Sequence, residues 1–122
     1  MKQVTKKTAG KQIVVFDNIL DTYPGGVHID PVEAKKRFAD GVIPAGTALV
    51  PATDGKFKPL NEALTAANLA GCIGLTSEAI AVDDFPLVAC VLSGIARKEA
   101  LPDKEKTGVA FLKTALPRIS FV

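Results

Sequence analysis

The chain has little of the chemistry on which most enzymes and metal sites depend. Among its 122 residues there is no tryptophan, only one histidine and only two cysteines. A zinc site needs three or four Cys, His or acidic ligands close together, and His28, Cys72 and Cys90 form no such cluster in the sequence. The glycine pattern of a phosphate-binding loop is absent too. We therefore expect no catalytic residue, no metal and no cofactor, and predict that the protein is not an enzyme.

A strong charge of one sign and a long hydrophobic run are also lacking. The net charge is +2 and the sequence pI is about 8.6, too modest to indicate a nucleic-acid partner. The apolar runs are far shorter than the ~20 residues that cross a bilayer, and no segment resembles a signal peptide. These features predict no nucleic-acid or membrane partner, and a cytosol-like compartment or a particle assembled there.

Enough apolar residues are present for a well-filled core. Hydrophobic residues make up 48% of the chain, and the mean hydropathy is +0.24. The length fits one domain.

Residues 1–10 are polar, basic and rich in threonine, which predicts a flexible N-terminal arm. The basic residues assigned to this arm and its junction are Lys2, Lys6, Lys7 and Lys11. Residues 11–122 are expected to form a single, mostly β domain.

Two turn signals lie close together in residues 40–50. Asp40-Gly41 is a chain-reversing pair, Pro44 presets φ, and Gly46 supplies a positive φ before a strand over 47–50. The pattern predicts a tight β corner. Because the segment carries no side chain suited to catalysis, its role is expected to be architectural.

The remaining apolar segments are short and separated by turn residues, which favours a mainly β fold with antiparallel hairpins. Strands are expected at 12–16, 56–60, 72–82, 87–97 and 119–122. The strand at 56–60 is expected at a sheet edge because Pro59 closes it. Residues 72–82 and 87–97 should form a central hairpin joined by 83–86, with 87–92 buried on both faces.

One to three short helices should accompany these strands. Asp30 as N-cap, Pro31 at the first helical position and Glu33 at the third predict a helix over 31–39. Its residues 35–37 are expected to form a solvated basic face, while Val32 and Phe38 point inward. A second helix should run from 107 or 108 to 115, after an exposed stretch at 104–107. Residues 61–70 fit either helical turns or a structured loop.

The three reactive residues, one histidine and two cysteines, are expected to have ordinary structural roles. His28 lies in a loop-like segment before the helix start, with no nucleophile or second ligand near it in the sequence. Cys72 and Cys90 lie in apolar runs, which predicts buried, reduced thiols, with a disulfide between them as the alternative.

The order of four segments carries a resemblance to a known class of proteins. These segments are Gly41-Val-Ile-Pro-Ala-Gly-Thr-Ala-Leu-Val, Asp54-Gly-Lys-Phe-Lys-Pro-Leu, Ala70-Gly-Cys-Ile-Gly-Leu-Thr-Ser-Glu-Ala-Ile and Leu87-Val-Ala-Cys-Val-Leu-Ser-Gly-Ile-Ala-Arg-Lys-Glu-Ala-Leu-Pro. Over residues 40–102 the pattern resembles tailed-phage head decoration proteins of the lambda type and the capsid-binding base of phage head fibre proteins. The ending at 116–122 is also similar to some head-fibre-type proteins.

The resemblance implies a small, mostly β domain with a β-clip-like corner. It further implies a homotrimer at threefold or quasi-threefold points of an expanded capsid, with the major capsid protein as partner and an N-terminal arm that orders on the shell. Such a protein would be assembled in the bacterial cytoplasm and end on the virion surface.

A second resemblance leaves an alternative open. Ile43-Pro-Ala-Gly-Thr-Ala-Leu is also similar to the turn of SAF-type domains, which implies a β-clip module that binds sugar acids or accompanies an enzyme. This alternative needs a pocket with convergent polar groups, for which the sequence offers Arg97, Lys98 and Glu99. A small hydrolase built around His28 has the least support.

Overall fold

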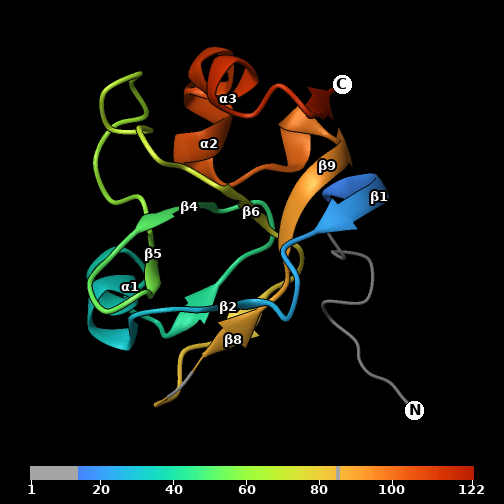
Figure 1. Cartoon of the computed structure of the whole chain (residues 1–122). Coiled ribbons are helices and arrows are strands. Elements are labelled where there is room, and N and C mark those ends of the chain that lie inside the picture. The colour runs from blue at the N-terminus through green and yellow to red at the C-terminus, as the bar shows by residue number, and fades with distance from the viewer. Residues whose placement is uncertain (1–13, 85) are drawn as a thin grey trace, which may run out of the picture.

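The computed structural model of the chain describes residues 14–84 and 86–122. It is mainly β, with antiparallel sheets and three short α-helices, which confirms the predicted fold class (Figure 1). The predicted arm at residues 1–10, with Lys2, Lys6 and Lys7, lies outside the described residues, as does Lys11.

Ten short strands and four helical segments make up the described chain. The strands are β1 (Phe16–Thr22), β2 (Val27–His28), β3 (Val42–Ile43), β4 (Ala48–Pro51), β5 (Phe57–Pro59), β6 (Gly74–Thr76), β7 (Ile80–Ala81), β8 (Leu87–Val88), β9 (Cys90–Ala96) and β10 (Ile119–Phe121). The helices are α1 (Pro31–Arg37), α2 (Asp103–Thr107) and α3 (Val109–Ala115), with a 3-10 turn, η2, at Lys98–Ala100.

The main sheet is organised around β9. Its strand order is β1-β9-β6-β4-β5, and β10 also pairs with β9, in parallel. β2 pairs with β8 and β3 with β7 in two separate two-stranded sheets. Figure 1 shows α2, α3 and the C-terminus at one end of the molecule and α1, β2 and β8 at the other. As predicted, β5 lies at the sheet edge and a terminal strand follows α3.

The predicted central hairpin is correct only at its base. β6 and β9 pair antiparallel at Leu75–Val91 and Thr76–Cys90. Beyond these pairs the two arms separate, and β7 pairs with β3 while β8 pairs with β2. Leu87 is therefore 53% exposed, so the expected burial on both faces is wrong before Cys90. Each arm pairs with a different strand that is distant in the sequence. The local alternation of apolar and polar residues does not predict such long-range pairing.

Residues 12 and 13 of the first predicted strand, at 12–16, lie outside the described residues, and of its described part only Phe16 is in a strand. β1 begins at Phe16 and pairs antiparallel with β9, with three register shifts along its length. Most of its side chains are exposed, which suits Asp17, Asn18 and Asp21. Pairing with the central strand β9, rather than an apolar run in its own sequence, positions β1.

Helix α1 begins as predicted. The Asp30 carboxylate accepts hydrogen bonds from the backbone N–H groups of Val32, at 3.0 Å, and Glu33, at 3.4 Å. The helix ends at Arg37 rather than at 39, with Phe38 as its C-cap. Val32 is 66% exposed, so its expected inward position is wrong, whereas Phe38 packs against the core. The short helix faces the core mainly through Ala34.

Two groups of buried side chains hold the fold together. The larger group contains residues of β4, β6 and β9 together with residues of the segments around α2, α3 and β10, including Leu75, Val91 and Leu112. The smaller group lies beside α1 and the two-stranded sheets and includes Ile29, Ala34 and Ile43. Residues 61–70 form turns rather than a helix, so the structured-loop alternative holds there.

Candidate functional site

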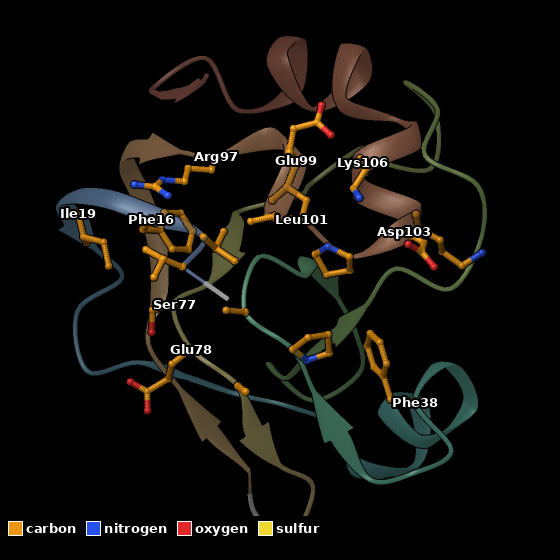
Figure 2. Close-up of a pocket in the computed structure, with 18 of the residues that line it drawn as sticks. Phe16, Ile19, Phe38, Ser77, Glu78, Arg97, Glu99, Leu101, Asp103 and Lys106 are labelled. Atoms are coloured by element: carbon orange, nitrogen blue, oxygen red, sulfur yellow. The ribbon is translucent and has the colours of Figure 1, made fainter. Parts of the chain in front are cut away.

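An open groove beside β1 is a large concave surface of the described chain (Figure 2). Its volume is about 1300 Å³. Its lining comes from the start of the described chain and β1, from the end of α1 at 37–38, from the corner at 44–45, from 77–79, and from the segment that runs from Arg97 into α2. Phe16, Pro44 and Leu101 supply apolar lining, and charged side chains lie around the rim. The groove therefore joins segments that are far apart in the sequence.

The charges of the groove do not converge on one point. The Arg97 Nε donates to Asp17 Oδ1 at 2.6 Å, so this guanidinium is already engaged by a carboxylate. Figure 2 shows Glu78 and Ser77 on the side of β1, with Asp103 and Lys106 on the opposite side. Apolar lining with dispersed charges suits contact with an extended chain or a protein surface, because a catalytic site needs groups directed at one reacting atom.

A buried ion pair lies directly behind this groove. Arg37 lines the groove, and its two terminal guanidinium nitrogens, Nη1 and Nη2, donate to the two carboxylate oxygens of Glu105, the first of them at 2.7 Å. The side chains of Arg37 and Glu105 are 5% and 0% exposed. Glu105 Oε2 also accepts from the Ala48 N–H at 2.9 Å, and Arg37 donates to the Leu60 carbonyl at 2.9 Å. Charge and hydrogen bonding together connect α1, β4 and α2.

The sequence predictions missed this pair. Arg37 was expected on a solvated helix face and Glu105 in an exposed stretch, and both expectations are wrong. A weak signal for Glu105 does exist, because it follows Leu101 by four residues and precedes Leu112 by seven. That spacing places an acid on the apolar stripe of a helical segment. No comparable signal distinguishes Arg37 from its lysine neighbours.

The architectural turn residues divide into two groups. Gly41 and Gly46 have φ of +79° and +85°, as the predicted corner requires. The Asp40 carboxylate accepts from the Val42 N–H at 3.2 Å at the start of β3, away from the groove. Pro44 lines the groove, and a Cβ on Gly46 would lie 2.9 Å from Leu101 Cδ2. The second half of the corner therefore forms part of the groove wall.

Hydroxyl groups fasten this corner to the main sheet. The Thr47 and Thr76 hydroxyls both donate to the Pro44 carbonyl, at 2.7 and 2.8 Å. The Thr76 hydroxyl oxygen also accepts from the Thr47 N–H at 3.0 Å. Both threonines are fully buried, so these bonds replace those that water would make. They hold the corner in place beside β6.

The cysteines and the histidine lie apart from the groove lining. His28 is exposed on β2. Both cysteines are free thiols, and Cys90 is fully buried, as expected. Cys72 is only partly buried, so its expected burial is wrong. Burial raises the pKa of Cys72 to about 11 and that of Cys90 to about 12. Because the thiolate is the nucleophile and the metal ligand, both groups are held in their less reactive form.

Residues 14–84 and 86–122 contain no group of three His, Cys, Asp or Glu side chains placed to hold a metal ion. In the same part of the chain, no helix is long and apolar enough to cross a membrane.

The chain was also compared with known proteins. No family model, curated protein or solved structure matches it.

Proposed function

We propose that the protein is a structural component of a phage or prophage head, a decoration protein or the base of a head fibre, which binds the major capsid protein as a homotrimer. The observation that carries the proposal is the order of turns and apolar segments over 40–102, which resembles head decoration proteins of the lambda type. In the fold, this stretch contains β3 to β9 and the corner with Gly41 and Gly46.

The physical demands of decoration suit this fold. A decoration protein needs a stable shape and surfaces that contact several subunits at once, and contacts made at several points add up to avidity without strong individual contacts. β1 pairs with β9 on one side only among the described strands, and Ile19 and Leu20 on it are 43% and 68% exposed. An exposed strand edge with apolar side chains is a ready surface for another chain.

A homotrimer is the expected assembly on the shell. Closed threefold symmetry uses one heterologous contact repeated three times, so each copy must offer two different surfaces. The open edge of β1 is one candidate surface. The arm lysines Lys2, Lys6, Lys7 and Lys11 stay a prediction for the contact with the capsid, since they lie outside the described residues.

Binding to heads tests the proposal. Expanded heads of the phage or prophage that encodes the chain, prepared without it, are mixed with the purified protein and sedimented. Saturable binding with a plateau at three copies per threefold site is expected. A Lys2→Glu, Lys6→Glu, Lys7→Glu variant should bind more weakly.

The matched control for this variant is Lys35→Glu, Lys36→Glu, Lys113→Glu, which changes the net charge equally at exposed positions of α1 and α3. If both triple variants lose binding equally, the arm has no specific role. If the unaltered protein does not sediment with the heads, the proposed function is wrong.

An SAF-like ligand-binding module is the second candidate function. The groove beside Arg97 favours it, because this arginine and Glu99 are two of the three polar residues that such a pocket would use. The Arg97 guanidinium is engaged by Asp17, however, and the remaining charges are dispersed around the rim. Calorimetric titration with sugar acids tests this candidate, and saturable one-to-one binding would favour it over decoration.

A further inference from the structure

The groove beside β1 starts where the described chain starts. Val14 and Val15 line it. The Val15 carbonyl accepts from the Arg97 N–H at 2.6 Å, which continues the β1–β9 ladder beyond the Phe16–Ala96 pair. In an antiparallel ladder Val14, the residue before Val15, is directed toward the residues that follow Arg97. Those residues, from Glu99 to Lys104, form part of the groove wall.

The size and lining of the groove fit a peptide segment. Small-molecule sites usually enclose about 300–1,000 Å³, and this groove, at about 1300 Å³, is larger and open. Phe16, Pro44, Leu101 and Pro102 give it an apolar lining. An extended segment could place alternate side chains against that lining and keep its polar groups in solvent.

Charge favours a basic occupant. Residues 1–13 carry four lysines and no acidic residue. Glu78, Glu99 and Asp103 are exposed on the groove rim, and none of them takes part in an ion pair among the described residues. Lys104 follows Asp103 in α2 and also lines the groove. Figure 2 shows Lys106 on the same side as Asp103, whereas Glu78 lies on the side of β1. The β1 side is therefore the better environment for lysines.

We propose that the groove is a docking site for the chain's own residues 1–13. Covalent attachment at Val14 gives the segment an effective concentration in the millimolar range, so a free-peptide dissociation constant of about 1 mM would hold it docked about half of the time. A segment held this weakly exchanges with solvent and stays open to proteases, as expected of a flexible arm. Docking does not depend on the proposed function, although it would limit how freely the lysines reach a shell.

Paramagnetic relaxation in the full chain tests the docking. A nitroxide is attached to a Thr5→Cys variant of the nitrogen-15-labelled protein. Cys72 and Cys90 should react slowly with the reagent at neutral pH, because burial raises the pKa of each thiol. The amide signals of Ala45, Ser77 and Glu78 are expected to lose most of their intensity. A label on Lys113→Cys of α3 is the control and should leave these signals unchanged.

Two further measurements identify the occupant and the force that holds it. In the first, Thr5→Cys protein at natural isotope abundance carries the nitroxide and is mixed with nitrogen-15-labelled protein that has no nitroxide. Only the nitrogen-15-labelled copies give amide signals, and their groove signals should keep their intensity. Glu78→Gln with Glu99→Gln should weaken the effect within one chain, whereas Glu62→Gln, outside the groove, should not.

Groove signals that are no weaker with the Thr5→Cys label than with the Lys113→Cys label would overturn the proposal. Loss of the signals in the mixed sample would overturn it too, since a second copy would then supply the occupant. Either result leaves the head-binding experiment unaffected, so the docking proposal and the proposed function fail separately.

Discussion

Two arginine–carboxylate pairs lie at the same groove, one behind it and one on its rim. The Arg37 and Glu105 side chains are 5% and 0% exposed and are joined through both terminal guanidinium nitrogens of the arginine. They also bind two backbone groups, the Leu60 carbonyl and the Ala48 N–H. The Arg97 and Asp17 side chains are 55% and 38% exposed and share one hydrogen bond. Chemically similar pairs thus differ in burial and in the number of backbone groups that depend on them.

The difference shows which parts of the molecule are fixed. Removing one partner of a buried pair leaves an uncompensated charge away from water, whereas water and salt screen an exposed pair. The Arg37–Glu105 pair therefore fixes α1 against β4 and α2. The rim pair near the start of β1 leaves that edge free to adapt to another chain.

The largest effect is expected from breaking the buried pair. Arg37→Ala should lower the free energy of unfolding by about 3–5 kcal/mol, because Glu105 would remain buried without its partner. Urea unfolding followed by circular dichroism measures the loss. A loss below about 1 kcal/mol would place this pair in the class of surface pairs.

The double variant Arg37→Met, Glu105→Leu is the matched control. It should recover much of the loss, because neither buried charge remains. Recovery should be incomplete, since the Ala48 N–H loses its acceptor and an unsatisfied buried group costs about 1–3 kcal/mol. A double variant as unstable as Arg37→Ala would show that the cost comes from lost packing rather than from charge.

The corner glycines extend the comparison to uncharged residues. Gly41 and Gly46 have similar positive φ, and alanine at such a position costs roughly 1–2 kcal/mol. A Cβ on Gly46 would also press on Leu101 at 2.9 Å, whereas no atom lies within 4 Å at Gly41. Gly46→Ala should therefore be more destabilising than Gly41→Ala by about 1 kcal/mol. Equal thermal unfolding temperatures for the two variants would contradict this account.

The buried Cys90 thiol allows the cost of burying an uncharged polar group to be measured. Cys90→Ser should destabilise the protein more than Cys90→Ala, by about 1 kcal/mol or more, because a buried hydroxyl needs a hydrogen bond that an alanine does not. Urea midpoints of the two variants give the comparison. A serine variant at least as stable as the alanine variant would indicate an available hydrogen-bond partner at this position.

Alkaline pH should weaken the fold through the same thiols. In the folded protein the pKa values of Cys72 and Cys90 are about 11 and about 12, above the ordinary value of 9.0. Between these values the folded state binds more protons than the unfolded state, so stability falls as pH rises above 9. Urea midpoints measured at rising pH should show this loss. It should be smaller in a Cys72→Ala, Cys90→Ala variant, and an equal loss would assign it to other groups.

The smallest effect is expected at the rim. Arg97→Ala should change the free energy of unfolding by at most about 1 kcal/mol, as is usual for an exposed pair. The same should hold for Asp17→Ala, and added salt should reduce both effects. A loss comparable to that of Arg37→Ala would mean that the two pairs do not differ as their burial indicates.

Local chemistry explains what could be predicted from the sequence. The cap at Asp30, the positive φ at Gly41 and Gly46, and the edge strand ended by Pro59 depend on neighbouring residues alone, and all are confirmed. The position of β1 and the separation of the two hairpin arms depend on distant strand partners, so the predictions there were displaced.

The same distinction holds for the candidate site. Pro44 and Gly46 were predicted as a turn, yet the groove that Pro44 lines also needs Leu101, far along the chain, against which a Cβ on Gly46 would press. Arg37 and Glu105 are 68 residues apart in the sequence, and each lies in a charged stretch typical of a solvated surface. Only the packing of α1 against the rest of the fold shows that they pair.

Electron cryomicroscopy of expanded heads saturated with the protein tests the central proposal most directly. The heads are those of the phage or prophage that encodes the chain, compared with the same heads before addition. Added density at threefold or quasi-threefold points that fits three copies of the β domain is expected. Heads unchanged by the protein, or density that lacks threefold or quasi-threefold symmetry, would contradict the proposal.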